Sequence, residues 1–558
     1  MLQETTIALT ENSAPSLRTG PRPSIGTLFL VFVMGLPLFW LLGAALMSVG
    51  VDESGIAATM LPIAIKETGL LMLSVGLMTG VLGLISAWLV THYEFPLRRV
   101  LEWALVLPLA IPTYLAAYCF VELLDFTGPV QQALRAVTGA TVVGDYWFPQ
   151  IRSNAGAALV LSLVLYPYVY LSCRAFFLMQ SGSAAAAART LGASGVRTFL
   201  TVILPLSRPA LIVGMTLAMM EVLNDLGAVQ YFGVNSLTAV IYSTWINRAS
   251  FGGAAQLAVT IVLIVGVLIL AERWGRRDQA HGVHRDNRTP PPREILHGAR
   301  AALAFLFCAL LVLGAFVLPA GELLNLALRA LDPGALVATG AALANTLGLA
   351  LAGALFTVAI GFYAAHRSGR GDLAVARGAV RLATLGYAIP GTVLALGLLQ
   401  PLGWGDRWFN AFTRAGFGWT PGLILSGTAL ALFYVYAIRF LAVTHSTLSE
   451  AMEKRGRSML DAGKVLGSRG LDLLVRIDLP TLAPALFAAS TLVFVEIIKE
   501  LPATLLLRPI GVETLATLVY GKANAGLFAQ AALPALAIVL AGLAPVVLAT
   551  QLSGNRKV

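Results

Sequence analysis

The chain has 558 residues, of which 58% are hydrophobic and 12% are charged, and its mean hydropathy is +0.80. Soluble domains carry about 25% charged residues, so this chain cannot cover a water-facing surface, and a soluble globular protein is excluded. The net charge of +10 comes from Lys and Arg gathered in short segments between apolar runs. This distribution is typical of the cytoplasmic loops of a membrane protein, so we expect no nucleic-acid partner.

The apolar runs set the predicted fold. A membrane-spanning helix needs about 20 mostly apolar residues. The run that follows the polar residues 1–26 is too long for the core of a signal peptide, so we expect it to be kept as the first spanning helix. We predict an all-α membrane protein with twelve transmembrane helices, at residues 28–49, 68–91, 100–124, 155–178, 208–230, 255–272, 300–320, 342–365, 380–402, 422–444, 484–505 and 530–552.

Residues 273–299 separate the sixth predicted helix from the seventh. This stretch is polar and basic and contains three consecutive prolines, which is typical of a linker. It divides the chain into a first half, residues 1–272, and a second half, residues 300–558. With both termini and the linker in the cytoplasm, most of the 38 Lys and Arg residues fall on the cytoplasmic side, as the positive-inside rule requires.

The two halves repeat short phrases in the same order. "LPLSRPAL" at 204–211 returns as "LPTLAPAL" at 479–486, and "LPLAIPTYLAAY" at 107–118 resembles "ATLGYAIPGTVLAL" at 383–396. Six helices return the chain to its starting side, so the copies have the same orientation. We predict two parallel six-helix repeats that form a pseudo-dimer, with the transport pathway between them.

A long cytoplasmic segment precedes the repeated phrase in each half. A helix-favouring stretch leads to Gly192 or Gly467, where a glycine offers a helix end. An amphipathic run then reaches the Leu-Pro pair, where we expect proline to interrupt the helix as the chain re-enters the membrane. Such an element would lie outside the bilayer, attached to two spanning helices and placed to receive a push from a cytoplasmic partner.

The spacing in these segments resembles the motif of the permease subunits of binding-protein-dependent ABC importers: Glu-Ala-Ala, three residues, Gly, nine residues, Ile-x-Leu-Pro. The resemblance implies a type I importer-like fold in which each segment docks on an ATP-hydrolysing subunit. The first copy has Ala186 where the motif carries an acid and the second keeps Asp461, so we expect unequal coupling. The residues implied in coupling are Ala186, Ala187, Ala188, Gly192, Leu204, Pro205, Asp461, Ala462, Gly463, Gly467, Leu479 and Pro480.

The chain contains no Gly-x4-Gly-Lys-Ser/Thr phosphate loop, so we expect it to be a permease rather than an enzyme, with no cofactor of its own. The resemblance implies two copies of a separate ATPase, carrying ATP and Mg, at the cytoplasmic face. It further implies a periplasmic substrate-binding protein and a multi-pass location in the lipid of a bacterial inner membrane.

The fifth predicted helix of each half carries charges at membrane depth, where they are costly and usually face a cavity or a partner. Spacings of three and four place these side chains on one helix face. We predict that they line the pathway or its gate, although Lys499 could instead neutralise Glu496 or Glu500 within its own helix. The residues are Glu221, Asn224, Asp225, Glu496, Lys499 and Glu500.

The phrases "NDLGAVQYFGV" and "KELPATLLLRP" resemble the fused two-half permeases for ferric iron. Carboxylates suit a hard cation, so Glu221 and Glu496 could hold Fe3+ transiently. A permease for thiamine or phosphonate is one alternative, and a proton-coupled secondary transporter is another. The long cytoplasmic segments argue against the latter. A membrane enzyme is disfavoured because the sequence contains no nucleophile–base arrangement, metal-ligand cluster or phosphate loop.

The cysteines and histidines carry little functional signal. The three cysteines lie far apart in apolar segments, so we expect ordinary packing rather than disulfides. His281 and His284 in the linker offer two ligands at most, and we expect them to be solvated. The other histidines fall at cytoplasmic helix ends: His92, His297, His366 and His445.

Overall fold

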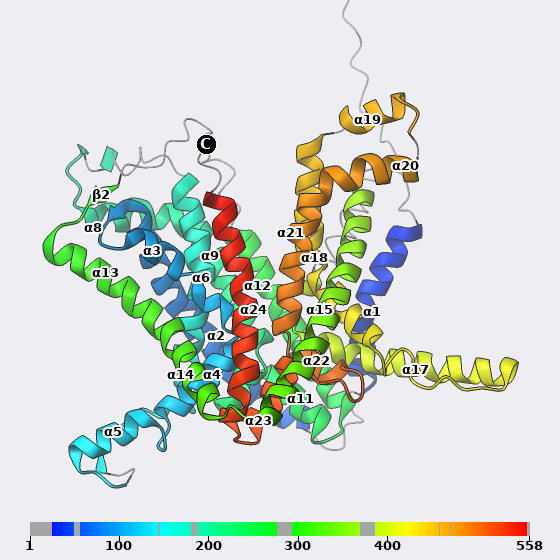
Figure 1. Cartoon of the computed structure of the whole chain (residues 1–558), viewed down its shortest axis with the longest axis horizontal. Coiled ribbons are helices and arrows are strands. Elements are labelled where there is room, and N and C mark those ends of the chain that lie inside the picture. Colours follow the sequence, from blue (N-terminus) through cyan, green and yellow to red (C-terminus); the bar gives the residue numbers. More distant parts are fainter. Residues whose placement is uncertain are drawn as a thin grey trace, which may run out of the picture.

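The computed structural model describes residues 25–48, 56–142, 145–179, 187–188, 190–275, 293–368, 385–456, 458–468 and 470–554. Within these residues the chain is almost entirely helical, as predicted (Figure 1). A short parallel sheet pairs β1 (Tyr93–Glu94) with β2 (Glu294–Ile295). The Leu296 N–H also donates to the Glu94 carbonyl at 3.0 Å. The end of the predicted linker is therefore attached to the first half.

The first half contains long helices joined by short helical turns. Their bounds are α1 (Ile25–Met47), α2 (Ile56–His92), α3 (Arg98–Ala104), the 3-10 turn η1 (Leu107–Ala110), α4 (Thr113–Leu124), α5 (Pro129–Thr138), α6 (Asn154–Met179), α8 (Gly195–Thr198), the π-helix η3 (Phe199–Ile203), α9 (Leu204–Asn224), α10 (Gly227–Tyr231), α11 (Leu237–Ile246) and α12 (Phe251–Gly275).

The second half follows a similar order. Its elements are α13 (Gly298–Val312), the π-helix η5 (Leu313–Val317), α14 (Leu318–Arg329), α15 (Pro333–Ser368), the 3-10 turn η6 (Leu385–Ala388), α17 (Gly391–Phe417), α18 (Ala429–Arg455), α19 (Ser458–Val465), α20 (Leu471–Leu473), the π-helix η7 (Leu474–Asp478), α21 (Leu479–Lys499), α22 (Pro502–Leu507), α23 (Leu515–Asn524) and α24 (Phe528–Gly554).

The later parts of the two halves match closely in length. A π-helix of five residues leads into α9 and into α21, and each of these helices has 21 residues. A short helix, a helix of ten residues and a long final helix follow in both halves. Side-chain contacts recur as well, because Thr68 Oγ1 accepts from Leu237 N at 2.9 Å and Thr346 Oγ1 from Leu515 N at 2.8 Å.

In the described residues, eight helices are long and apolar enough to cross a membrane, or nine if one bent pair counts as a span. A multi-pass membrane protein is thereby confirmed, while the count of twelve stays a prediction. The predicted helix at 100–124 is broken, because the chain bends by 94° between Ala110 and Thr113. Pro112 explains the break, since the residue before a proline favours an extended backbone, and Ile111 has ψ 114°.

Several helices lie outside the predicted segments. Among them are α5, α11 and α23, which are too short or too polar to read as spans from apolar length. The last part of α17 likewise continues beyond the predicted segment that ends at residue 402.

The first helix of each half packs across the boundary between the halves. α1 lies against α17, and α13 and α14 lie against α3 and α4 (Figure 1). Glycines allow close approaches across this boundary. A Cβ on Gly397 of α17 would come within 2.5 Å of the Pro37 carbonyl oxygen of α1, and one on Gly542 of α24 within 2.6 Å of the Ala110 carbonyl oxygen of η1. The halves therefore form one packed body.

The cysteine prediction is confirmed. Cys119, Cys173 and Cys308 are buried and free. The two linker histidines, His281 and His284, lie outside the described residues.

Candidate functional site: a cavity between the halves and two cytoplasmic elements

The fifth long helix of each half ends just before an acidic residue inside the protein. Asp225 follows α9 and Glu500 follows α21, and both have extended backbones. Each carboxylate caps the next short helix, since Ala228 N donates to Asp225 Oδ1 at 2.8 Å and Ala503 N to Glu500 Oε1 at 2.9 Å. The prediction of one unbroken helix through each acid is therefore wrong, because a capping carboxylate starts a new helix.

A cavity of about 100 Å³ lies where these two breaks meet. Its walls come from both halves, including η1, α4, α6, α9, α18, α21 and the starts of α10 and α22. All six polar residues predicted from the fifth helices line it: Glu221, Asn224, Asp225, Glu496, Lys499 and Glu500. The fold thus brings them together, whereas their part in transport stays a prediction.

Two ion pairs occupy half of the carboxylates in this cavity. Lys499 Nζ lies 2.8 Å from Glu496 Oε1 within α21, as the alternative interpretation of the sequence required. Glu500 pairs instead with Arg439, at 2.8 Å between Oε1 and a guanidinium nitrogen. In the described part of the chain neither Glu221 nor Asp225 forms an ion pair. With all groups ionised, the cavity therefore carries a net negative charge.

Arg439 is the cavity residue that the sequence analysis missed. It lies ten residues after Ala429, the first residue of α18, while Val164 lies ten residues after Asn154, the first residue of α6. Both line the cavity. A lone arginine inside an apolar segment predicted to span the membrane is the signal that could have identified it. The two halves thus present a cation and an apolar side chain at matching places.

The cavity also contains polar atoms available to a solute. The side-chain oxygens of Asn224 and Tyr114 have no hydrogen-bond partner among the residues that the structure describes. Buried polar groups are usually paired, so these two atoms can bind water or a solute in the cavity.

No group of three or more His, Cys, Asp and Glu side chains is placed to hold a metal ion within the described residues. Glu221 and Glu496, the two predicted iron contacts, both line the cavity.

The second candidate site is the pair of segments between the fourth and fifth long helices, which end in η3 and η7. We call them the cytoplasmic elements after the side of the membrane that the sequence predicts for them. Gly192 and Gly467 have φ of +85° and +93°, values that favour glycine. The N–H that follows each glycine donates to the carbonyl five positions back, at 3.0 Å in both halves. These contacts form a glycine helix end, as the sequence predicted.

The Leu-Pro pairs do not interrupt the helix, contrary to the sequence prediction. Leu204 and Leu479 begin α9 and α21 directly after the π-helices η3 and η7, and one continuous helix extends from Phe199 to Asn224 and another from Leu474 to Lys499. A proline clashes with the carbonyl four positions earlier and lacks an N–H. The wider π-turn, in which Leu204 N bonds the Phe199 carbonyl, accommodates Pro205 without a break.

The matched motif residues are placed as follows. The helical turns before the two glycines contain Ala187 and Ala188 in the first half and Asp461, Ala462 and Gly463 in the second. Ala186 lies outside the described residues. The expected contrast between Ala186 and Asp461 therefore stays a prediction. Asp461 pairs with Lys464 at 2.8 Å on the surface.

An exposed leucine stands directly before each of the two glycines. Leu191 is 89% exposed and Leu466 is 85% exposed. Exposed apolar groups at matching places of two projecting elements are typical of a contact surface.

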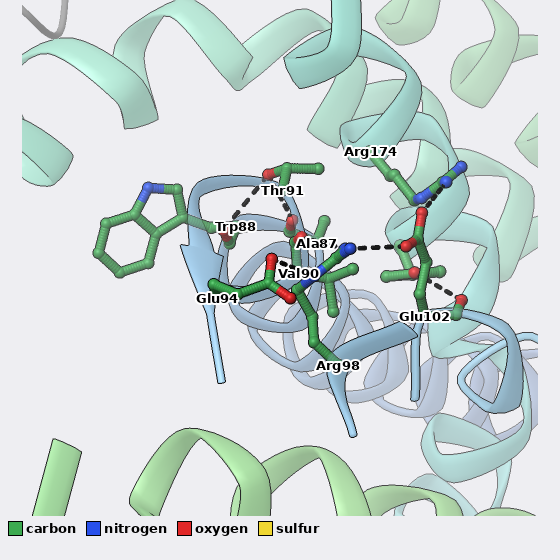
Figure 2. Close-up of polar contacts among 9 residues, drawn as sticks. Ala87, Trp88, Val90, Thr91, Glu94, Arg98, Glu102 and Arg174 are labelled. Carbon is green, nitrogen blue, oxygen red and sulfur yellow. Dashed lines mark hydrogen bonds and ion pairs between the residues drawn. The ribbon is translucent and has the colours of Figure 1, made fainter. Parts of the chain in front are cut away.

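Different contacts support the two cytoplasmic elements. In the first half, a polar network joins α2, α3 and α6, the helices that precede the element, and includes no residue of the element itself (Figure 2). Arg98, which is buried, donates to Glu94 at 2.9 Å and to Glu102 at 2.8 Å, and Arg174 pairs with Glu102. Phe199 of η3 packs on Trp88 of α2, at 4.7 Å between ring centroids.

In the second half an ion pair holds the element directly. Asp478, the last residue of η7, is buried and pairs with Arg455 at the end of α18. Ile203 is the last residue of η3 and occupies the matching place in the first half. The second element is therefore held by a charge pair and the first by apolar packing.

Comparison with known proteins defines the class of this fold and site. Residues 79–273 match the family described as binding-protein-dependent transport system inner membrane component. The match includes the first cytoplasmic element and the first-half wall of the cavity.

Three relatives extend the comparison. The Fe(3+)-transport system permease protein FbpB 2 of Haemophilus influenzae is 25% identical over 94% of this chain and 98% of its own length. The sulfate transport system permease protein CysT of Salmonella typhimurium is 28% identical over 39% of this chain and 79% of its own. The molybdenum transport system permease protein ModB of Escherichia coli is 27% identical over 34% of this chain and 83% of its own length.

These matches confirm the resemblance on which the sequence analysis rests. Residues 79–273 belong to this family of ABC importer permease subunits, and the similarity to a relative that spans both halves agrees with a fused two-half permease. The family is a transport permease rather than an enzyme.

Proposed function

We propose that this chain forms the pathway for ferric iron across the inner membrane. A periplasmic binding protein delivers the ion and a separate ATPase drives its passage. The acid-rich cavity between the halves is the observation that carries the proposal, and the full-length similarity to an Fe(3+)-transport permease supports it.

The charge of the cavity favours a cation over an oxyanion. Arg439 and Lys499 are already paired with carboxylates, so neither is free to bind sulfate or molybdate. Glu221 and Asp225 would repel such anions at short range. Glu221 and Glu496 line the same cavity, and their carboxylates offer the hard oxygen ligands that suit Fe3+. Glu221 and Glu496 act as transient contacts.

The size of the cavity favours a small ion over an organic solute. Pockets for drug-sized ligands enclose about 300–1,000 Å³, and a water molecule takes about 30 Å³. A cavity of about 100 Å³ matches an ion with a few waters better than it matches thiamine.

The two cytoplasmic elements serve as coupling helices. Each docks on one of two ATPase copies, which carry ATP and Mg, and Leu191 and Leu466 insert into the ATPase surface. The remaining motif residues shape these elements, and their rigid helical continuity with α9 and α21 transmits the motion to the cavity.

The arrangement in the membrane follows from the repeat. Twelve transmembrane helices form two parallel six-helix repeats, residues 1–272 and 300–558, joined by the cytoplasmic linker 273–299. Both termini lie in the cytoplasm. The equal lengths of α9 and α21 and the recurring contacts around them support this pseudo-dimer.

Uptake of radioactive iron, sulfate and molybdate tests the proposal in cells that lack this chain but keep its ATPase and binding protein. The chain should restore iron uptake alone. The double variant Glu221→Gln, Glu496→Gln should lose most of that uptake while still purifying with the ATPase. Restored sulfate or molybdate uptake without iron uptake would contradict the assignment of substrate.

A further inference from the structure

The second part of α17 leaves the helix bundle. Residues from Gly391 to Leu398 are buried, whereas the later turns extend sideways at the end of the molecule opposite α19 and α20 (Figure 1). The chain returns to α18 through residues 418–428. We name residues 402–428 the lateral arm.

The polar side of the lateral arm is covered by its own return segment. Asp406 accepts hydrogen bonds from Leu425 N at 2.7 Å, Ser426 N at 2.9 Å and Ser426 Oγ at 2.5 Å. Asn410 donates to the Gly422 carbonyl at 2.8 Å and accepts from the Gly422 N–H at 2.9 Å. Asp406 is consequently 1% exposed although its helix projects from the bundle.

The apolar side of the lateral arm faces outward. Trp404, Trp408 and Phe412 follow one another at intervals of four residues, so they share one helix face. They are 59%, 69% and 57% exposed. Trp419 and Leu423 of the return segment are exposed as well. An arm surrounded by water would bury its aromatic face and expose its carboxylate, so this arm is built for an apolar environment.

The aromatic face is continuous with an exposed apolar face of α1. Trp404 packs edge-on against Trp40 at 5.1 Å between ring centroids, and Trp40 Nε1 donates to Gln400 Oε1 at 3.0 Å. On α1, Phe39, the residue before Trp40, is exposed, and so is Leu46. Because α1 lies in a predicted spanning segment, its exposed face meets lipid, and the arm extends that lipid-facing surface.

We propose that the lateral arm lies in the outer interface of the membrane, with its aromatic face at the boundary of headgroups and acyl chains. Tryptophan is enriched at this level, and amphipathic helices that carry arginine bind there. Arg407 and Arg414 are exposed beside the aromatic face, where they can reach lipid phosphates. The arm thereby fixes the depth of α17, whose buried turns pack beside the cavity.

A spin label on a cysteine introduced at Ala415 tests this placement. Ala415 is exposed on the aromatic side of the helix. The three native cysteines are buried, so they should react little with the spin label and add little background signal. The full chain is placed in nanodiscs of phosphatidylcholine and phosphatidylglycerol. The control label replaces Val465 at the exposed end of α19. Collision with oxygen should dominate at Ala415, and collision with a water-soluble nickel complex should dominate at Val465.

A second variant separates lipid contact from simple burial. This variant adds three substitutions to the Ala415→Cys chain: Trp404→Ser, Trp408→Ser and Phe412→Ser. They should raise the nickel accessibility of the label several-fold, while the chain still elutes as a monodisperse species. Equal nickel accessibility at Ala415 and Val465 in the parent variants would overturn the proposal. Protection of Ala415 that appears only on addition of the binding protein would instead make the arm a protein-docking surface, and the proposal would be wrong.

Discussion

At the residue scale, the most consequential side chain is Arg439. It stands in the wall of the cavity, is largely buried, and pairs with Glu500. Glu500 also accepts hydrogen bonds from Ala503 N, Thr504 N and Thr504 Oγ1. One ion pair thus joins α18 to the break after α21, at a place where the first half has an apolar residue.

Replacing Arg439 with leucine should lower the stability of the purified chain strongly. Removing one partner of a buried ion pair leaves an uncompensated charge and costs about 3–5 kcal/mol. The apparent melting temperature in detergent measures this effect. Lys499→Leu is the matched comparison, because Lys499 and Glu496 form a more exposed pair, so its loss should lower the melting temperature less than Arg439→Leu does.

The double variant Arg439→Leu, Glu500→Gln should recover much of the lost stability, since the amide keeps a hydrogen-bond acceptor for α22 without a charge. A melting temperature as low as that of Arg439→Leu alone would show that the guanidinium acts through packing rather than through the ion pair.

At the element scale, the two cytoplasmic elements share a backbone design and differ in support. Both end a helix at a glycine with positive φ and pass through a π-helix into a long spanning helix. The second is held by the Asp478–Arg455 pair and the first by apolar packing. The elements therefore share a shape while their attachments to the bundle differ.

Substituting the exposed leucines should weaken assembly with the ATPase without unfolding the chain. Leu191→Ser and Leu466→Ser each remove an apolar group that is almost fully exposed, so the melting temperature should stay unchanged. Co-purification with the ATPase should fall, most in the double variant. Lys464→Ser is the control for a general surface effect, because Lys464 lies in α19, the helix that ends just before Leu466. Full co-purification of the double leucine variant would remove these side chains from the contact.

The glycine ends should tolerate asparagine better than valine. Asparagine adopts the left-handed backbone more readily than other residues, whereas a β-branched residue at φ +93° is strained by about 1–2 kcal/mol. Gly467→Val should therefore reduce transport more than ATP hydrolysis, because the coupling helix is displaced while the ATPase keeps its own active site. Equal transport by Gly467→Val and Gly467→Asn would contradict the need for this backbone conformation.

At the scale of the whole molecule, the halves are held together by exchanged first helices and close glycine contacts. Tyr520 of α23 also donates to Gln230 of α10 at 2.7 Å across the boundary. The cavity exists because these contacts bring two separate helix breaks together.

A chain divided within residues 276–292 should therefore reassemble from its two co-expressed pieces. The contacts between the halves do not depend on that segment, and affinity purification of one piece should recover the other. Gly397→Leu with Gly542→Leu should abolish recovery, because each new side chain would meet a backbone carbonyl at under 3 Å. Gly266→Leu, where a Cβ meets no atom within 4 Å, is the matched control.

The sequence by itself determined the class of the protein, and it predicted six residues that line the cavity and the two glycines that end a helix. Apolar length identifies spanning helices because lipid accepts no charged surface, and the spacing of the Gly and Leu-Pro residues is a local property that repetition makes visible. The six cavity residues were found because charge at membrane depth is costly wherever it occurs.

The tertiary structure alone decided how these parts meet. The breaks at Asp225 and Glu500 depend on carboxylates that cap the following helices, and the partner of Glu500 comes from α18, far away in the chain. The apolar run of α17 does not reveal that its last turns leave the bundle with the aromatic side outward. Such features depend on packing between distant segments, which hydrophobic length and local spacing do not encode.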